Sequence, residues 1–151
     1  MEFSMQEIFP IIEEGIKNGG EYRFYPKGVS MLPLLREGID SVMLSAVNDV
    51  QKYDMILYQR DDGNYVLHRV VGIEDGKYDL CGDNQCYIEK GIRKEQVKAI
   101  VTSFYRDDEY ITVKNREYIK YARRRVASIP TRLFLIRLRG YLKRIKEIFS
   151  R

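Results

Sequence analysis

The sequence predicts a mainly β protein, built on an antiparallel sheet with a helix before it and a basic helical tail after it. Short runs rich in β-branched and aromatic residues recur between residues 21 and 113, with Gly-containing turns and no helical segments between them. The charge changes sharply after residue 115. Residues 1–115 carry 14 Lys/Arg against 20 Asp/Glu, whereas residues 116–151 carry 12 against 2. The tail is therefore strongly basic and the body is acidic, and the charge of the tail favours an anionic partner.

The length favours a single folded unit with three parts. A chain of 151 residues is long enough to bury a core in one domain. Residues 1–20 are expected to form an N-terminal helix packed on the domain, residues 21–115 the β domain, and residues 116–151 the basic amphipathic helical tail. The regular spacing of the strand candidates favours an antiparallel fold that forms a partly closed barrel.

The elements follow from hydrophobic periodicity. Between residues 5 and 18, isoleucines recur near helical spacing, and the pair Gly19-Gly20 supplies a stop, which predicts one amphipathic helix. The segments 61–64 and 74–77 each contain Asp and Gly, which is typical of hairpin turns. The expected strands lie around 22–24 and at 41–45, 55–58, 65–73, 78–80, 97–105 and 110–113.

The tail beyond Pro130 predicts a basic amphipathic helix. Phe134, Leu138, Tyr141 and Ile145 recur at three- and four-residue steps, and Arg and Lys fill much of the rest. Three interpretations stay open. The helix packs on the body through its apolar stripe, it lies at an anionic membrane surface through residues 131–151, or it binds nucleic acid, which is the least favoured of the three.

The termini and the cysteines limit the setting of the protein. The first residues have neither a basic nor an apolar signal region, and no stretch approaches a membrane-spanning length, so we expect a cytoplasmic protein that is peripheral at the membrane if its tail binds there. Cys81 and Cys86 are five residues apart, which matches neither a redox nor a zinc pattern. We therefore expect no metal and no cofactor.

Candidate catalytic residues lie in one ordered series. Ser30 sits in a turn bounded by Gly28 and Pro33, His68 is the only histidine of the chain, and Asp83 follows. This order supplies a nucleophile, a base and an acid that can orient the base. Taken singly, a serine in such a turn more often only helps to form the turn, and a lone histidine among apolar residues more often has a structural role.

Taken together, these motifs resemble the S24/S26 serine peptidases, which comprise signal peptidase I and the LexA-type self-cleaving repressors. The resemblance covers about residues 21–106 and implies a mostly β fold, a nucleophile at Ser30 and hydrolysis of peptide bonds. It rests on Gly28-Val-Ser-Met-Leu-Pro33, Gly38-Ile-Asp40, Tyr53-Asp-Met-Ile-Leu-Tyr58, His68-Arg-Val-Val71 and Gly82-Asp-Asn84.

The resemblance also implies roles for individual residues. Bacterial signal peptidases and LexA-type proteins have a lysine base at the position of His68, whereas endoplasmic-reticulum and archaeal signal peptidases have a histidine, so this chain is similar to the Ser/His branch. A histidine near its reference pKa of about 6.5 is largely neutral at pH 7 and ready to act as a base. The acid is Asp83, from the Gly-Asp-Asn motif, or Glu89, six residues later, where the Ser/His branch usually has it.

The chain departs from the family pattern before the nucleophile. The family commonly has a serine two positions earlier, whose hydroxyl helps to bind the oxyanion, and this chain has Gly28. Backbone N–H groups around Ser30, within the turn that includes Met31 and Pro33, are then expected to bind the oxyanion. About 20 residues precede the strands, too few for the DNA-binding module of a LexA-type repressor.

The sequence thus predicts a serine endopeptidase that cleaves a peptide or protein precursor, with Ser30 as nucleophile and His68 as general base. The alternative is a binding or scaffold protein that keeps the peptidase fold without turnover and is held at a membrane surface or partner by its basic tail. The distance and orientation between Ser30 and His68 distinguish these two hypotheses.

Overall fold

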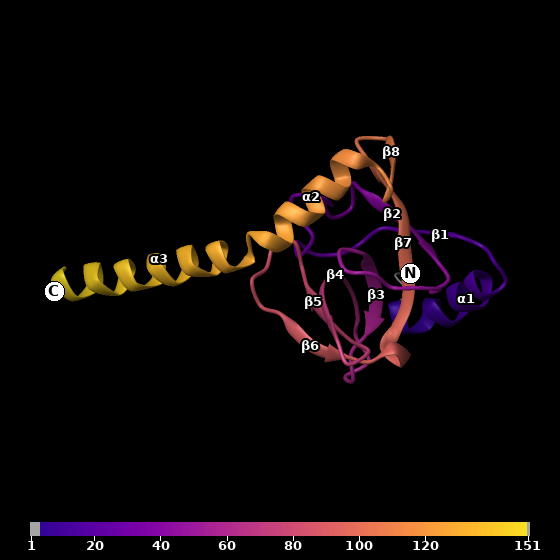
Figure 1. Cartoon of the computed structure of the whole chain (residues 1–151), viewed down its shortest axis with the longest axis horizontal. Helices are drawn as coiled ribbons and strands as arrows, with labels where there is room; N and C mark the ends of the chain where they lie inside the picture. The colour runs from indigo at the N-terminus through magenta and orange to yellow at the C-terminus, as the bar shows by residue number, and fades with distance from the viewer. Residues whose placement is uncertain (1–3, 151) are drawn as a thin grey trace.

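An eight-stranded antiparallel sheet forms the body of the protein, and the computed structural model describes residues 4–150 of it (Figure 1). The strands pair in the order β1-β2-β7-β3-β4-β5-β6, with β8 paired to β7. The strands are β1 (Tyr22–Phe24), β2 (Ser41–Ser45), β3 (Met55–Gln59), β4 (Tyr65–Glu74), β5 (Lys77–Cys81), β6 (Glu89–Ile92), β7 (Val97–Arg106) and β8 (Glu109–Thr112).

The sheet is open. Within residues 4–150, β1 and β6 end the strand order and do not pair with each other, so the expected partial closure into a barrel is replaced by a sheet with two free ends. The physical reason lies in β1, which is only three residues long and pairs with β2 on one side alone. The antiparallel, mainly β class is confirmed.

Helix α1 (Met5–Lys17) covers one end of the sheet. Its first turn is held by Glu7, whose carboxylate accepts a hydrogen bond from the backbone N–H of Ser4 at 2.8 Å. Phe9, Ile12 and Ile16 are buried on one side of the helix. The helix ends where Gly19 adopts a φ of +86°, a conformation that favours glycine. The predicted N-terminal helix is confirmed.

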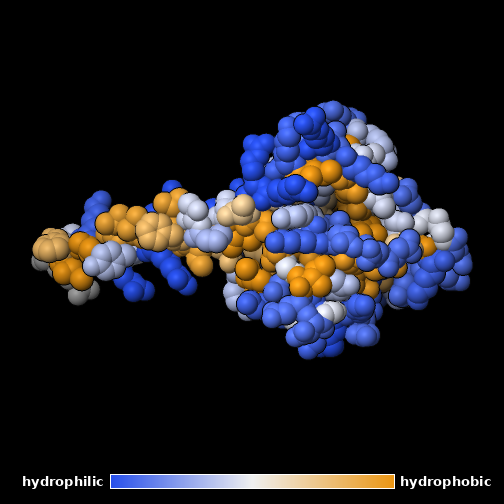
Figure 2. Space-filling view, viewed as in Figure 1, coloured by the Kyte–Doolittle hydropathy of each residue, from blue (hydrophilic) through white to orange (hydrophobic). Residues whose placement is uncertain are grey.

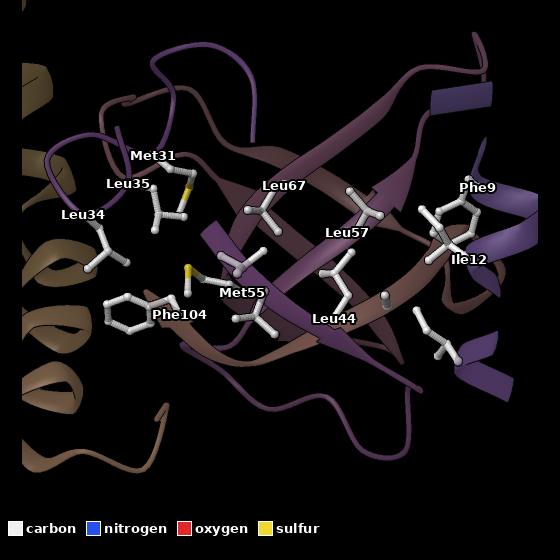
Figure 3. Packing of buried hydrophobic residues seen from close by; sticks show 14 of the residues in the cluster. Phe9, Ile12, Met31, Leu34, Leu35, Leu44, Met55, Leu57, Leu67 and Phe104 are labelled. Carbon is white, nitrogen blue, oxygen red and sulfur yellow. The ribbon is translucent and has the colours of Figure 1, made fainter. Parts of the chain in front are cut away.

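Each strand of the centre buries both of its faces, which produces two hydrophobic clusters. In β3, Met55 and Leu57 belong to a larger cluster with α1, whereas Ile56 and Tyr58 belong to a smaller one on the other face. Figure 3 shows the larger cluster between Phe9 and Ile12 of α1 at one end and Leu34 and Phe104 at the other. Side chains on β4 follow the same alternation, so neighbouring residues of this strand face different surroundings.

The C-terminal segment contains two helices that differ in their packing. Helix α2 (Arg116–Ala127) is capped by Asn115 and buries Tyr118 and Ala122 against the body. Helix α3 (Ile129–Phe149) begins with Pro130 in its first turn and extends away from the body (Figure 1). Its apolar side chains beyond residue 133 are largely exposed, so the structure does not show the expected packing of this stripe on the body.

No helix within residues 4–150 combines the length and the apolarity that crossing a membrane requires.

Candidate active site

The loop that carries Ser30 is fixed from both sides. Gly28 adopts a φ of +82°, and its N–H donates to Oε1 of Glu37 at 2.8 Å. The next anchor is Met31, whose side chain is buried in the larger cluster. Arg106 donates to the carbonyl oxygens of Pro33 and Leu34 at the end of the loop. Ser30 itself is partly exposed.

A second loop, residues 82–86, holds the backbone of Ser30. The N–H of Asn84 donates to the carbonyl oxygen of Ser30 at 2.8 Å, and its side-chain amide donates to Val29 at 3.2 Å. Gly82 leaves just enough space for this contact. A Cβ atom at Gly82 would lie 2.7 Å from the Ser30 carbonyl oxygen and 3.1 Å from its Cβ. Glycine is therefore required at this position for the two loops to meet.

The strand register relates His68 to the 82–86 loop. His68 lies on β4 opposite Ile56 of β3, and its side chain is 3% exposed. On the other side of β4, Arg69 pairs with Cys81, so extending this register by one residue sets Gly82 opposite His68. Ser30 in turn packs against Gly82, so Gly82 is the residue through which the Ser30 loop meets this part of β4. Within residues 4–150 no hydrogen bond joins Ser30 Oγ to the imidazole.

Tyr58 connects His68 to Glu89. The hydroxyl of Tyr58 lies 3.2 Å from Nδ1 of His68 and donates to Oε1 of Glu89 at 2.9 Å. A tyrosine hydroxyl has a single proton, so a hydroxyl that donates to the carboxylate accepts from the imidazole. His68 therefore carries its proton on Nδ1, and its Nε2 has a free lone pair. This is the tautomer that a general base requires at Nε2.

Burial keeps the His68 imidazole neutral, and hydrogen bonds keep the Glu89 carboxylate ionised. Burial lowers the pKa of His68 to about 4, against the attraction of Glu89. Burial also raises the pKa of Glu89, but hydrogen bonds from Arg60 and Tyr58 outweigh it, so the pKa is lowered overall. Arg60 Nε contacts Glu89 Oε1 at 2.9 Å. The sequence analysis expected a pKa near 6.5 for His68, and burial of the side chain makes the pKa lower than that.

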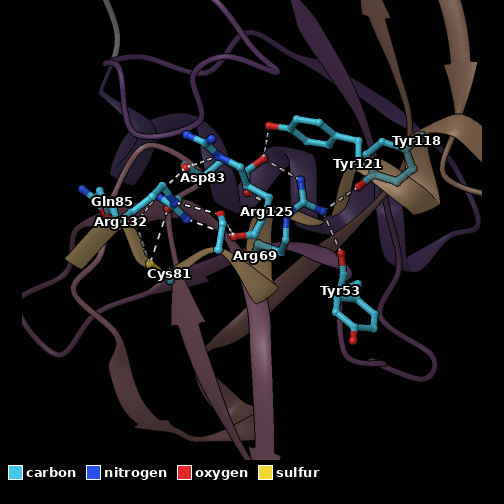
Figure 4. A network of polar contacts seen from close by, with 11 residues as sticks. Tyr53, Arg69, Cys81, Asp83, Gln85, Tyr118, Tyr121, Arg125 and Arg132 are labelled. Carbon is cyan, nitrogen blue, oxygen red and sulfur yellow. Dashed lines mark hydrogen bonds and ion pairs between the residues drawn. The ribbon is translucent and has the colours of Figure 1, made fainter. Parts of the chain in front are cut away.

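Asp83 lies in the same region but binds a different partner. Its two carboxylate oxygens accept from Nε and Nη2 of Arg69 at 2.7 Å each, and both side chains are 1% exposed (Figure 4). Tyr121 donates a further hydrogen bond to Asp83 at 2.9 Å, and Arg69 also binds Tyr118. Within the described residues, Asp83 makes no hydrogen bond to His68. Its observed role is to hold the 82–86 loop on β4.

Two arginines join the C-terminal helices to the same loop. Arg125 of α2 donates to the carbonyl oxygen of Asp83 at 2.7 Å. Arg132 of α3 donates to the carbonyl oxygens of Asp83 and Gln85 at 3.1 and 2.8 Å. Figure 4 shows both guanidinium groups beside this loop. The start of α3 is therefore bonded to the loop that contacts Ser30.

Unpaired backbone donors lie in the loop that carries Ser30. Within residues 4–150, the backbone N–H groups of Ser30 and Met31 have no hydrogen-bond acceptor. The N–H of Gly28 is bonded to Glu37 and is not free. These two N–H groups are thus available to a ligand at the Ser30 loop, whereas that of Gly28 is not.

A groove of about 590 Å³ lies beside Ser30. The groove faces the edge of β4, because the three consecutive residues 65–67 line it although their side chains alternate in direction. No strand among residues 4–150 pairs with this edge, since β5 pairs with β4 only from Arg69 onward. The segment 24–28 also lines the groove, and most of the remaining lining is apolar and comes from α1 and the core, with Met5, Ile8, Ile12, Met31, Leu35 and Leu57.

The structure thus groups the predicted site residues in two sets. Ser30, Gly28, Met31 and Pro33 share one loop, and His68 lies on β4, whose register with β5 leads to Gly82, the residue that packs against Ser30. Glu89 reaches His68 only through Tyr58, and Asp83 is bonded to Arg69. Tyr58 was missed by the sequence analysis, although counting strand pairs back from the turn at 61–64 places Tyr58 opposite Val66 and on the same face as His68.

Comparisons with protein-family models, curated proteins and solved structures return no match for the chain. Its function has to be inferred from the residues and geometry of the site itself.

Proposed function

We propose that the protein is a serine endopeptidase with a fold of the signal peptidase and LexA type, in which Ser30 is the nucleophile and His68 the general base. The observation that carries this proposal is the hydrogen-bonded series from Glu89 through Tyr58 to His68. It leaves Nε2 of the imidazole unprotonated, and therefore able to accept a proton from the Ser30 hydroxyl. A buried histidine with a purely structural role does not require an ionised acid such as Glu89 hydrogen-bonded to the tyrosine that contacts it.

The proposed reaction has two steps. Nε2 of His68 takes the proton of the Ser30 hydroxyl while Oγ attacks a peptide carbonyl carbon, and the N–H groups of Ser30 and Met31 bind the oxyanion. The imidazolium gives its proton to the leaving amine, so the C–N bond breaks and an acyl-enzyme forms. Water, deprotonated by the same imidazole, then hydrolyses this ester. Because Ser30 and His68 are not hydrogen-bonded in the free protein, side-chain rotation on substrate binding must bring them together.

The groove supports a peptide substrate in extended form. The unpaired edge of β4 at residues 65–67 offers backbone donors and acceptors on one side of the groove. A peptide lying there would form strand hydrogen bonds, and its alternate side chains would contact the apolar floor. Backbone recognition of this kind accepts many sequences, with selectivity coming from the floor.

A fluorophosphonate probe tests the nucleophile directly. The wild-type protein is expected to be labelled on Ser30, as located by mass spectrometry, whereas Ser30→Ala and His68→Ala lose the label. Ser150→Ala is the matched control, because Ser150 is an exposed serine far along the chain, and its labelling should equal that of the wild type. Equal labelling of all four proteins overturns the proposal. A wild-type protein that binds extended peptides but is never labelled is instead a binding protein without turnover.

A further inference from the structure

An apolar stripe on α3 lacks a partner. Beyond Leu133, eight apolar side chains recur at three- and four-residue steps along one side of this helix. Seven of them are exposed, from 40% at Leu138 to 86% at Phe149, and Ile145 is half-buried. Figure 2 shows these hydrophobic residues along the projecting helix to its tip, with hydrophilic side chains beside them. The α3 stripe consists of Phe134, Leu135, Leu138, Tyr141, Leu142, Ile145, Ile148 and Phe149.

The α3 stripe is not an extension of the side by which the helix is attached. Ile129 is buried and Leu133 is half-buried where α3 leaves the body. At 3.6 residues per turn, these two residues and Ile136 lie on the side of the helix facing away from the stripe. The body therefore contacts the side of α3 that bears Ile129 and Leu133, and the α3 stripe on the other side is not covered by residues 4–150.

Basic residues border the stripe on both sides. Arg137 and Arg144 follow one border, and Arg139 and Lys146 follow the other. Residues 134–149 contain five Lys/Arg and a single acidic residue, Glu147. Pairing two copies of α3 through the stripe would set these bordering cations against one another, which disfavours a second copy as the occupant.

We propose that α3 lies in the plane of an anionic lipid bilayer, with the α3 stripe among the acyl chains and its bordering Arg and Lys side chains at the phosphate groups. The combination fits a bilayer surface better than nucleic acid, because a phosphate backbone would engage the cations and leave the eight apolar residues in water. Phe134, Tyr141 and Phe149 lie on the stripe, and aromatic side chains favour the interfacial region of a bilayer. This inference goes beyond peptidase activity and does not depend on it.

Vesicle flotation with the full-length protein tests the proposal. The protein is mixed with vesicles of phosphatidylcholine alone or of phosphatidylcholine with phosphatidylglycerol. The informative variant is Leu138→Glu/Leu142→Glu, which places carboxylates on the stripe. Ile136→Glu is the matched control, because it makes the same kind of change at an exposed position on the opposite side of the same helix. Circular dichroism checks that all three proteins retain the same fold.

The expected result is strong flotation with the anionic vesicles, little with the neutral ones, and a decrease with added salt. The double variant should bind at least about tenfold more weakly, since two buried leucines are lost from the interface. Ile136→Glu should lose less. Absence of flotation, or equal weakening by Leu138→Glu/Leu142→Glu and Ile136→Glu, overturns the proposal. A dimer in solution that the double variant abolishes identifies a second copy as the occupant and also overturns it.

Discussion

The hydroxyl of Tyr58 lies 3.2 Å from Nδ1 of His68 and donates its only proton to Glu89. This relationship fixes the tautomer of the histidine through a neutral intermediary, where a carboxylate in direct contact would be the more familiar arrangement. Tyr58 stays protonated because burial and the nearby Glu89 carboxylate raise its pKa. A phenol that cannot ionise here keeps a fixed donor and acceptor pattern.

Replacing Tyr58 with Phe should slow catalysis without changing substrate affinity. The imidazole would lose its partner at Nδ1, so the base would no longer be held in one tautomer, and we expect a loss on the order of ten- to a hundredfold in kcat with little change in KM. His68 is the only histidine, so its ring ¹⁵N signals are unambiguous in NMR. They should report Nδ1–H in the wild type and a mixture in Tyr58→Phe. An unchanged tautomer in the variant would contradict this role.

The pH dependence should reveal a histidine that stays neutral in the folded protein. Its pKa is lowered from the ordinary value near 6.5 to about 4 by burial, so the unfolded chain binds more protons between these values. Stability attributable to His68 should therefore be full above about pH 6.5 and fall as the pH decreases toward 4, by up to about 3 kcal/mol in total.

Denaturant unfolding of the wild type and His68→Gln across this pH range measures the effect. The variant does not titrate at this position, so the difference between the two stability curves isolates His68. The same pKa predicts peptidase activity that is nearly constant above about pH 5 and decreases below it. A difference between the curves that stays flat from pH 7 to 4 would show that His68 is not protected from protonation.

Gly82→Ala should disturb the contact between the two loops. The new methyl group would meet the carbonyl oxygen of Ser30 at 2.7 Å, so the backbone must move. We expect a destabilisation of about 1–3 kcal/mol and a large loss of activity. Gly140→Ala is the control, because no atom lies within 4 Å of the added methyl group and alanine favours the helix. Thermal unfolding and probe labelling should separate the two variants, and similar behaviour would argue against a fitted contact at Gly82.

Breaking the buried pair between Arg69 and Asp83 should be far more costly than breaking an exposed one. Asp83→Asn leaves the Arg69 guanidinium buried without a counter-charge, so a loss of about 3–5 kcal/mol is expected. Asp61→Asn removes one partner of the exposed pair with Arg93 and should change stability by less than about 1 kcal/mol. The double variant Arg69→Met/Asp83→Leu should recover part of the loss. Denaturant unfolding measures all three, and equal losses for Asp83→Asn and Asp61→Asn would contradict the pairing.

The positions of most strands along the chain could be predicted from sequence because alternation and turn residues are local signals, whereas their order in the sheet could not. The strand at 41–45 has the expected bounds, and the turns at 61–64 and 74–77 lie where Asp and Gly predicted them. β6 was missed because only Ile92 among its four residues is buried, which leaves no periodicity to detect. The openness of the sheet was also missed, since closure depends on how its outer strands meet in space.

Local sequence motifs suggested candidate site residues but not their partners. They single out Ser30 and His68 as candidates, whereas the hydrogen bonds of Asp83 and Glu89 depend on which residues the sheet brings beside them. Asp83 meets Arg69 because β5 pairs with β4, and Glu89 meets Tyr58 because β6 continues that pairing. Both contacts join residues at least 14 positions apart in the sequence, so no short window of sequence contains them.

Because side chains alternate in direction along β4, a deletion of one residue within this strand would reverse the direction of every side chain beyond it. Leu67 faces the larger cluster, His68 the Tyr58 side, and Arg69 the buried Asp83. Deleting one residue between 65 and 70 would exchange these directions at once, burying a guanidinium among apolar side chains and turning the imidazole away from its partner. Insertions in the exposed turn at 61–64 leave the directions unchanged. The protein should therefore tolerate insertions in the turn at 61–64 but not a change of length between residues 65 and 70.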